Sequence, residues 1–204
     1  MILYRPVGLN ELRLIYESGL KVFPPRLPEQ PIFYPVLNGE YARQIALEWN
    51  TKSEPFAGYV TEFEVHDIYV SQFERQIVGG RQHEELWVPA EQLDEFNRHI
   101  INAIRVIEAY FGDEFQGFIP EQFGLKGKNA VSQFVALANI MDYSGMDFYL
   151  EIKANHMAVF LNYPFWLKHD FHSYNIDDTM RRKTLEAIKQ IWLESYPEFE
   201  LVSS

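Results

Sequence analysis

Three short apolar segments in the first ninety residues constrain the fold of this chain most. They are residues 3–8 (LYRPVG), 32–36 (IFYPV) and 84–89 (EELWVP), and each carries a polar or aromatic side chain at one fixed place. Short runs of β-branched and aromatic residues that end at glycine or proline are typical of strands. Three such strands can bring an early arginine (Arg5), a central aromatic residue (Tyr34) and a late glutamate (Glu85) to one cleft.

In the rest of the first half, segments that predict helices alternate with segments that predict strands. Residues 23–28 hold three prolines, so this loop should be stiff and extended. Val60 and its neighbours alternate in polarity as a half-buried strand does. The expected elements are a helix that Asn10 caps and Gly19 ends, a helix over 39–49 after the cap Asn38, a strand over 58–65 and a short helical turn over 68–73.

The region after Pro89 predicts one long helix up to residue 111. Leu93, Phe96, Ile100, Ile104, Ile107 and Phe111 are spaced by three and four residues, and Gly112 follows. Further along, the expected elements are a helix over 129–141, a hairpin of two strands over 147–153 and 157–163, and a helix over 178–195. We therefore expect one domain over residues 1–111 and an α+β subdomain over 112–204 that packs on it.

Composition narrows the classes of protein. The 204 residues include no cysteine, which suits a reducing cytoplasm, and no apolar run approaches the roughly 20 residues that cross a bilayer. The start of the chain lacks the basic and then apolar pattern of a signal peptide. A formal net charge of −11 argues against binding to nucleic acid phosphates. The sequence therefore predicts a soluble cytoplasmic protein with neither a membrane nor a nucleic acid as its partner.

Common chemical motifs are absent. The chain has no phosphate-binding GxxxxGK[ST], no GxGxxG after a strand, no GxSxG and no thiol. Only His169 and His172, on either side of Asp170, bring metal-ligand types close together, and they lie in an expected loop with aromatic neighbours. We predict no metal site.

The segment from Glu85 to Pro89 is similar to the strand that carries the catalytic glutamate in ADP-ribosyltransferases. Arg5 and Tyr34 lie where that family has a residue that contacts the dinucleotide and an aromatic residue that stacks on nicotinamide. The resemblance covers about residues 1–110. It implies an α+β fold in which a split antiparallel sheet with flanking helices binds NAD as a substrate, together with a C-terminal helical and hairpin subdomain. The chain departs from the family pattern in two ways. No serine-threonine-serine follows the middle strand, and the first strand has an arginine while the middle strand has a tyrosine.

The resemblance assigns roles to several residues. Glu85 would stabilise positive charge on the ribose as the bond to nicotinamide breaks. The family often has a glutamate or glutamine two positions earlier, where this chain has His83; if Glu84 is the catalytic residue instead, Gln82 fills that place. Both registrations stay open.

On the nucleotide side, Tyr4 and Arg5 would contact the dinucleotide, and Arg26 would present a cation to its pyrophosphate. Three of the candidates have an ordinary structural alternative. Arg5 and Arg26 could be surface cations, and Glu85 could be part of an acidic strand edge. Because Phe33 and Tyr34 point to opposite faces of a strand, one of them belongs to the core and the other is free to line a cleft.

Two functions follow as hypotheses. The first is an enzyme that binds NAD and transfers ADP-ribose to an acceptor that the sequence does not identify, a protein being one class. The second is a non-catalytic protein of the same fold that binds a protein partner through an acidic, aromatic-rich surface. An RNA 2′-phosphotransferase on this fold is disfavoured by the net charge and by the lack of a basic cluster.

Overall fold

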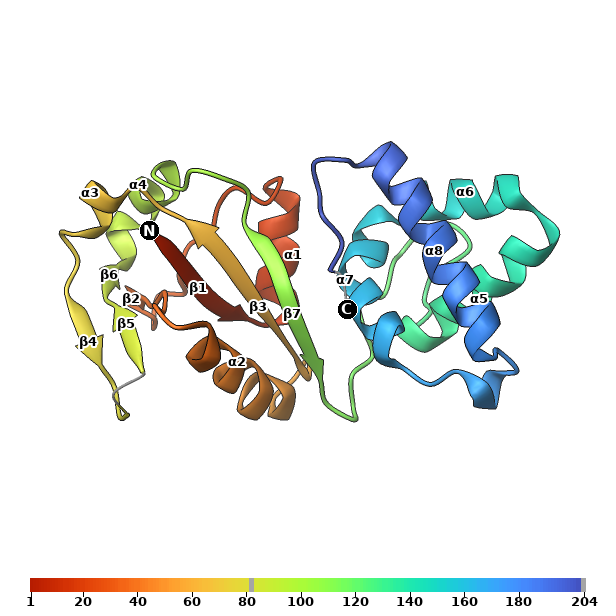
Figure 1. Ribbon diagram of the computed structural model, residues 1–204, viewed down its shortest axis with the longest axis horizontal. Helices are drawn as coiled ribbons and strands as arrows, with labels where there is room; N and C mark the ends of the chain where they lie inside the picture. The colour runs from red at the N-terminus through yellow and green to blue at the C-terminus, as the bar shows by residue number, and fades with distance from the viewer. Residues whose placement is uncertain (81–82, 203–204) are drawn as a thin grey trace. The chain divides into compact units, whose positions relative to one another are not determined.

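The computed structural model describes residues 1–80 and 83–202 (Figure 1). The chain divides into two compact units, Met1–Asp113 and Glu114–Ser204. Unit 1 contains small antiparallel sheets with helices, and unit 2 is helical. In the described part of the chain, no helix is both long enough and apolar enough to span a membrane.

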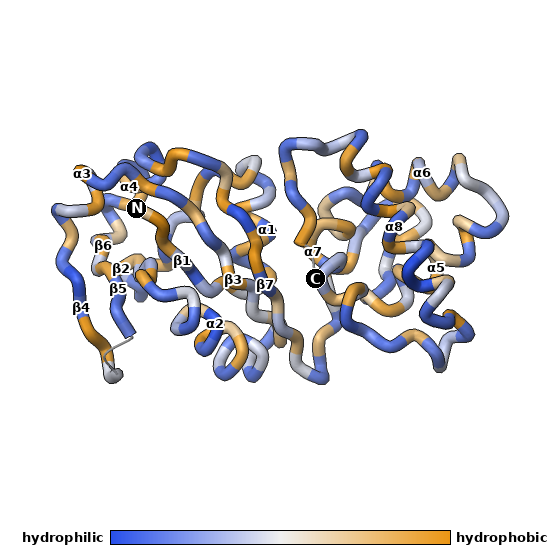
Figure 2. Tube along the Cα trace, viewed as in Figure 1, coloured by the Kyte–Doolittle hydropathy of each residue, from blue (hydrophilic) through white to orange (hydrophobic). Residues whose placement is uncertain are grey.

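Unit 1 is built on an antiparallel sheet in the order β1–β3–β7 (Figure 1). The strands are β1 (Ile2–Val7), β3 (Ala57–Glu64) and β7 (Arg105–Phe111). Arg5 pairs with Thr61, whose hydroxyl donates to the carbonyl oxygen of Arg5 at 2.8 Å. The register between β3 and β7 shifts between Val60 and Thr61. Figure 2 shows hydrophobic residues along these strands. Such residues are expected where a sheet packs against a core.

Residues 31–37 lie between β1 and a hairpin formed by β4 (Arg75–Ile77) and β5 (Glu84–Leu86), and they pair with both. The other short strands are β2 (Ile32–Phe33) and β6 (Val88–Pro89). Val36 forms bridges with Tyr4 on one side and with Glu85 on the other, and β4 pairs with β5. Phe33 lies opposite Val88. The register is therefore constant along this stretch, and β1 and β5 flank the same segment.

Two helices cover opposite faces of this sheet. On one face, Val36 and Val60 pack with Ala42 of helix α2 (Gly39–Glu48). On the other face, Arg5 reaches Glu11 of helix α1 (Leu9–Glu17). Neighbouring residues of a strand point to opposite faces, so Tyr4 lies on the α2 side and Arg5 on the α1 side.

Glycine allows α2 to approach the sheet closely. A Cβ atom on Gly58 of β3 would overlap the backbone carbonyl oxygen of Ala46 in α2. Asn38 caps the helix, since its side chain accepts a hydrogen bond from the backbone amide of Glu40 at 2.8 Å. The cap predicted from sequence is confirmed, and position 58 has room only for hydrogen.

The core on the α1 side is aromatic. The ring of Phe23 contacts those of Phe33 and Phe63 at 5.0 and 4.8 Å between centroids, and Phe96 contacts Phe33 at 5.4 Å. Asn97 holds the proline-rich loop here, because its amide accepts from the backbone nitrogen of Phe23 at 2.9 Å and donates to the carbonyl oxygen of the same residue at 3.0 Å. Shorter elements complete the unit: η1 (Asn50–Lys52), α3 (Asp67–Val70), η2 (Ala90–Gln92) and α4 (Leu93–Arg98).

The long helix predicted over residues 90–111 is wrong. Helix α4 ends at Arg98, and the chain becomes extended as β7 from Arg105. The backbone nitrogen of Ile104 donates to the carbonyl oxygen of Leu20 at 2.7 Å, outside any helix. Residues 105–111 are rich in β-branched and aromatic side chains, and β3 pairs with them along the strand on both sides of the register shift. Pairing with a distant strand therefore overrides the local helical spacing.

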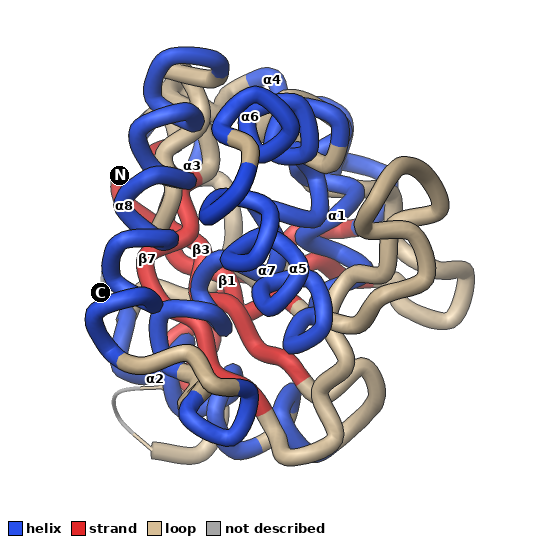
Figure 3. Tube along the Cα trace, turned by 90° about the vertical axis from the view of Figure 1, so that its right-hand side faces the viewer, coloured by secondary structure: helices blue, strands red, loops and turns tan. Residues whose placement is uncertain are grey.

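Unit 2 consists of helices joined by loops (Figure 3). Its elements are α5 (Ala130–Tyr143), α6 (Gly145–Ala154), α7 (His156–Lys168), η3 (His172–Tyr174) and α8 (Asp178–Ser195). The helices predicted over 129–141 and 178–195 are confirmed. Asn129 and Asp177 act as caps, accepting from the backbone amides of Ser132 and Met180.

The hairpin predicted over 147–163 is wrong, because α6 and α7 occupy it. Phe148 and Ile152 are the buried residues of α6, and their spacing of four is helical. The apolar alternation that predicted a strand also includes Leu150, which is exposed. Helix α7 is apolar almost all round, and a buried apolar run does not distinguish a helix from a strand by its period.

A buried amide pair holds the loop that precedes α5. Asn162 of α7 accepts from the backbone nitrogen of Phe118 at 2.8 Å and donates to its carbonyl oxygen at 2.9 Å. The same amide donates to the side-chain oxygen of Gln133 at 2.9 Å. Both amide side chains are fully buried. Gly117 has a φ of 81°, and a Cβ there would meet Asn162.

Candidate functional site

Arg5 points to the α1 face of the sheet and is fully engaged there. Its Nε donates to Oε1 of Glu11 at 2.8 Å, and its Nη2 donates to Oε2 at 3.3 Å. Nη1 donates to the backbone carbonyl oxygen of Tyr34 at 3.2 Å, and the guanidinium lies 4.6 Å from the ring centroid of Phe33. The side chain is 8% exposed. Arg5 thus ties β1, α1 and the 31–37 segment together.

Arg26 approaches the same carboxylate from the proline-rich loop. Its Nη1 lies 3.7 Å from Oε1 of Glu11, and its Nη2 donates to Oε1 of Gln30 at 2.6 Å. Burial lowers the pKa of Arg26, and the nearby charge of Arg5 lowers it further. Among the described residues, the buried Nε of Arg26 has no hydrogen-bond partner. Two cations therefore share one carboxylate, which leaves the group positive.

Tyr34 and Trp87 form a pair across neighbouring strands. Because Phe33 lies opposite Val88 and Val36 opposite Glu85, the constant register places Tyr34 opposite Trp87. Their ring centroids are 6.0 Å apart at an interplanar angle of 83°. Trp87 is 39% exposed, so the pair presents aromatic surface to solvent.

The pair lies beside a carboxylate, and the backbone of Tyr34 contacts a cation. The indole Nε1 of Trp87 donates to Oε1 of Glu85 at 2.9 Å, and Glu85 is 9% exposed. The backbone carbonyl oxygen of Tyr34 accepts from Nη1 of Arg5, which shares Glu11 with Arg26. We call these four residues, Arg26, Tyr34, Trp87 and Glu85, the Arg26–Glu85 strip.

His83 continues along the sheet face that carries Glu85. Its ring stacks on that of Tyr41 with centroids 4.3 Å apart, and its Nε2 lies 3.1 Å from Oε1 of Gln44. Burial raises the pKa of Tyr41, and the charge of Glu85 adds to the rise. Residues two apart on a strand share a face, so His83, Glu85 and Trp87 belong together.

Glu84 lies on the opposite face of β5 and pairs with Ile77. Its backbone carbonyl oxygen accepts from the amide of Leu37 at 3.0 Å. Gln82, the earlier position in the alternative registration, lies outside the described residues. The face that carries Tyr34 is therefore the face of Glu85, and Glu84 lies behind it.

Tyr4 lies opposite Val36, so it shares the sheet face of Glu85 and packs on the α2 side. Burial raises the pKa of its phenol, and the carboxylate of Glu62 raises it further. Arg5, its neighbour in the strand, points to the other face. The structure therefore brings Tyr34, Trp87 and Glu85 together on one face of the sheet, and places the Arg5 guanidinium on the other face, with Arg26 beside it at Glu11.

Two residues of this region were missed from sequence. Glu11 follows Arg5 by six residues, at the first turn of the helix that returns along β1. A charged residue in that turn was the available signal. Trp87 follows Glu85 by two positions and therefore shares its strand face.

The loop of unit 2 that contains His169, Asp170 and His172 brings metal-ligand residue types close together in the sequence. Nδ1 of His172 lies 2.5 Å from Oδ1 of Asp170, which raises the pKa of the imidazole. His169 stacks on Phe165, and burial lowers its pKa. In the described ranges, no group of three or more His, Cys, Asp or Glu side chains could hold a metal ion.

The contacts of Arg5 predict a structural effect. Arg5→Ala should lower the free energy of unfolding by about 2 to 4 kcal/mol, because it removes a buried ion pair and leaves the Tyr34 carbonyl oxygen without this donor. Urea titration followed by circular dichroism measures the change. Arg13→Ala is the control, since Arg13 is 43% exposed and pairs with Glu17 at 3.7 Å; it should cost less than about 1 kcal/mol. Equal stability of the two variants would contradict the assigned role of Arg5.

Comparison of the chain with protein-family models, with curated proteins and with solved structures finds no match.

Proposed function

We propose that unit 1 binds NAD and transfers its ADP-ribose group to a nucleophilic acceptor. The observation that carries this proposal is the Arg26–Glu85 strip, in which two aromatic side chains lie beside a carboxylate while the backbone of Tyr34 contacts the cation pair at Glu11. NAD combines a pyrophosphate, a planar nicotinamide ring and a ribose on which positive charge develops during the reaction. Each of these features has a chemical counterpart in the strip.

The cationic end suits the pyrophosphate. Arg26 and Arg5 both lie beside Glu11, so the group retains a positive charge that one carboxylate does not cancel. The proline-rich loop and Gln30 hold the Arg26 side chain, which is 12% exposed. A cation fixed in advance loses little conformational entropy when it binds an anion.

The carboxylate end suits the chemical step. As the bond between the ribose carbon and the nicotinamide nitrogen breaks, its electron pair leaves with nicotinamide and the ribose becomes cationic. Glu85 would stabilise that charge, and the acceptor then forms the new bond and loses a proton. The hydrogen bond from Trp87 fixes the carboxylate and keeps it from turning away.

Arg5 has a different role in this proposal from the one that the resemblance implies. Its guanidinium lies behind the sheet and binds Glu11 and the Tyr34 carbonyl oxygen. It therefore positions Tyr34 and shares the charge of Glu11 with Arg26. In this proposal the dinucleotide is contacted by Arg26, which shares Glu11 with Arg5 but belongs to the proline-rich loop and not to a strand of the sheet.

Calorimetric titration of the purified protein with NAD tests the proposal. Trp87→Ala should weaken binding by about tenfold, the value of an aromatic contact of about 1 to 1.5 kcal/mol. Trp49→Ala is the matched control, because Trp49 is 65% exposed and belongs to the end of α2 rather than to the strip. Equal weakening by both variants would remove the strip from the binding site. A wild-type protein that neither binds NAD nor releases nicotinamide would end the enzyme proposal.

A second candidate function is a non-catalytic protein that binds a protein partner. It is favoured by the contacts of the charged groups within the chain, since Arg5 donates to Glu11 and Trp87 donates to Glu85. This candidate predicts no NAD binding, so the same titration separates the two.

A further inference from the structure

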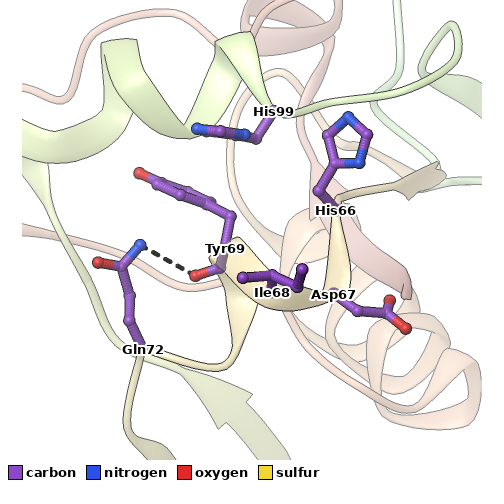
Figure 4. Close-up of a pocket in the computed structure, with 6 residues that line it drawn as sticks. All are labelled: His66, Asp67, Ile68, Tyr69, Gln72 and His99. Carbon is purple, nitrogen blue, oxygen red and sulfur yellow. Dashed lines mark hydrogen bonds between the residues drawn. The ribbon is translucent and has the colours of Figure 1, made fainter.

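Unit 1 has a pocket that is separate from the Arg26–Glu85 strip. It has a volume of about 690 Å³ and lies where helix α3 meets the end of α4 (Figure 4). Its lining residues are His66, Asp67, Ile68, Tyr69, Gln72 and His99. The volume falls within the range of small-molecule sites.

Aromatic rings form one wall of this pocket. The rings of Tyr69 and His99 stack with centroids 3.8 Å apart at 16°, and the ring of His66 stands edge-on to His99 at 6.0 Å. Tyr69 is held from behind by Phe73 and Phe96, at 5.3 and 6.2 Å. The wall is therefore a rigid π-surface.

An exposed apolar side chain completes the opening. Ile68 is 92% exposed. It belongs to the four-residue helix α3, which also carries Tyr69 of the aromatic wall. In Figure 4, Ile68 lies below the rings of His99 and Tyr69, whereas the carboxylate of Asp67 points away from the rings. Asp67 is paired with the amino group of Met1. An apolar ligand that covers Ile68 would remove this surface from water.

The polar atoms of the lining favour a ligand that donates hydrogen bonds. Nε2 of His99 lies 3.2 Å from Oε1 of Glu95, and since a carboxylate only accepts, Nε2 carries the proton. In the neutral imidazole, Nδ1 is then an acceptor. The side-chain nitrogen of Gln72 donates to the Tyr69 carbonyl oxygen at 2.9 Å, which leaves its amide oxygen as an acceptor.

We propose that this pocket binds a planar aromatic ligand that carries an N–H or O–H donor, of the chemical class of indoles and phenols. The ring packs on Ile68 and the aromatic wall, and the donor bonds to Nδ1 of His99. The proposal is independent of NAD binding, because none of its residues belongs to the strip.

Two probes that differ in one group test the hydrogen bond. Indole and 1-methylindole have nearly the same ring surface, but only indole has the N–H donor. In titrations followed by ligand-observed NMR, indole should bind the wild-type protein three- to tenfold more tightly than 1-methylindole, the value of one hydrogen bond. Equal affinities, or no binding of indole at millimolar concentration, would overturn the proposal.

Three variants test whether the probes bind in this pocket. His99→Phe keeps a stacked ring and removes the acceptor, so the two probes should then bind equally. Ile68→Ala should weaken both probes several-fold, and Ile119→Ala, an isoleucine of similar chemistry that is 45% exposed in unit 2, should weaken neither. A preference for indole that survives in His99→Phe would show that the donor binds elsewhere.

Discussion

The Glu85→Gln protein is expected to fold and to bind NAD as the wild type does, yet to release nicotinamide at least about a hundredfold more slowly. Glutamine keeps the shape of the side chain, and its amide oxygen can still accept from Nε1 of Trp87. The negative charge beside the developing cation is lost. Chromatography of nicotinamide over time measures the rate, and calorimetry measures the binding.

Glu84→Gln is the matched control, because Glu84 is the neighbouring carboxylate on the opposite face of β5. It should leave the rate within a few-fold of wild type. If Glu84→Gln slows the reaction and Glu85→Gln does not, the catalytic face is the other one. If both variants react at the wild-type rate, neither carboxylate takes part in the chemical step.

Gly58→Ala should be the most destabilising single change in unit 1, by about 4 kcal/mol or more. The added methyl group would overlap the carbonyl oxygen of Ala46, which belongs to the backbone of α2 and cannot turn away. Helix α2 would have to move off the sheet, and the contacts of Ala42 with Val36 and Val60 would loosen. Thermal unfolding followed by circular dichroism measures the loss.

Gly145→Ala is the comparison for this effect. No heavy atom lies within 4 Å of a Cβ at position 145, which opens helix α6. This variant should match the wild type or exceed it slightly, since alanine favours a helix over glycine. A Gly58→Ala protein as stable as Gly145→Ala would mean that α2 is free to shift.

Local signals in the sequence predict helix ends well. Asn38, Asn129 and Asp177 cap helices through their own side chains, and Gly19 ends α1 with a φ of 78°. These features depend only on neighbouring residues. The first helix is the exception, because it begins at Leu9 after Gly8, ahead of the predicted cap Asn10.

Distant pairing explains the larger errors. Residues 105–111 carry side chains that suit a strand, but only the presence of β3 beside them decides their structure. In the region of α6 and α7, apolar residues are so frequent that both periods fit. The α+β class of the chain and the helices α5 and α8 could be predicted, whereas the hairpin expected between those two helices was wrong and the partners of the strands could not be predicted.

The same division applies to the candidate site. The period of two in a strand is enough to place His83 with Glu85, and to separate Phe33 from Tyr34, of which Phe33 is fully buried. The pairing of Arg5 with Glu11 depends on how α1 turns back along β1. That turn is a tertiary event, and the sequence of the strand contains no sign of it.

Asn97 and Asn162 each satisfy both backbone groups of one loop residue, Phe23 and Phe118. A side-chain amide thus takes the place that a neighbouring strand would have, in segments that have no strand to pair with. These bonds reach only the main chain, so they do not select the side chain of the loop residue; at Phe23 the aromatic core selects it. Insertions and deletions in the two loops should therefore be tolerated poorly, because they would shift the bonded residue out of reach.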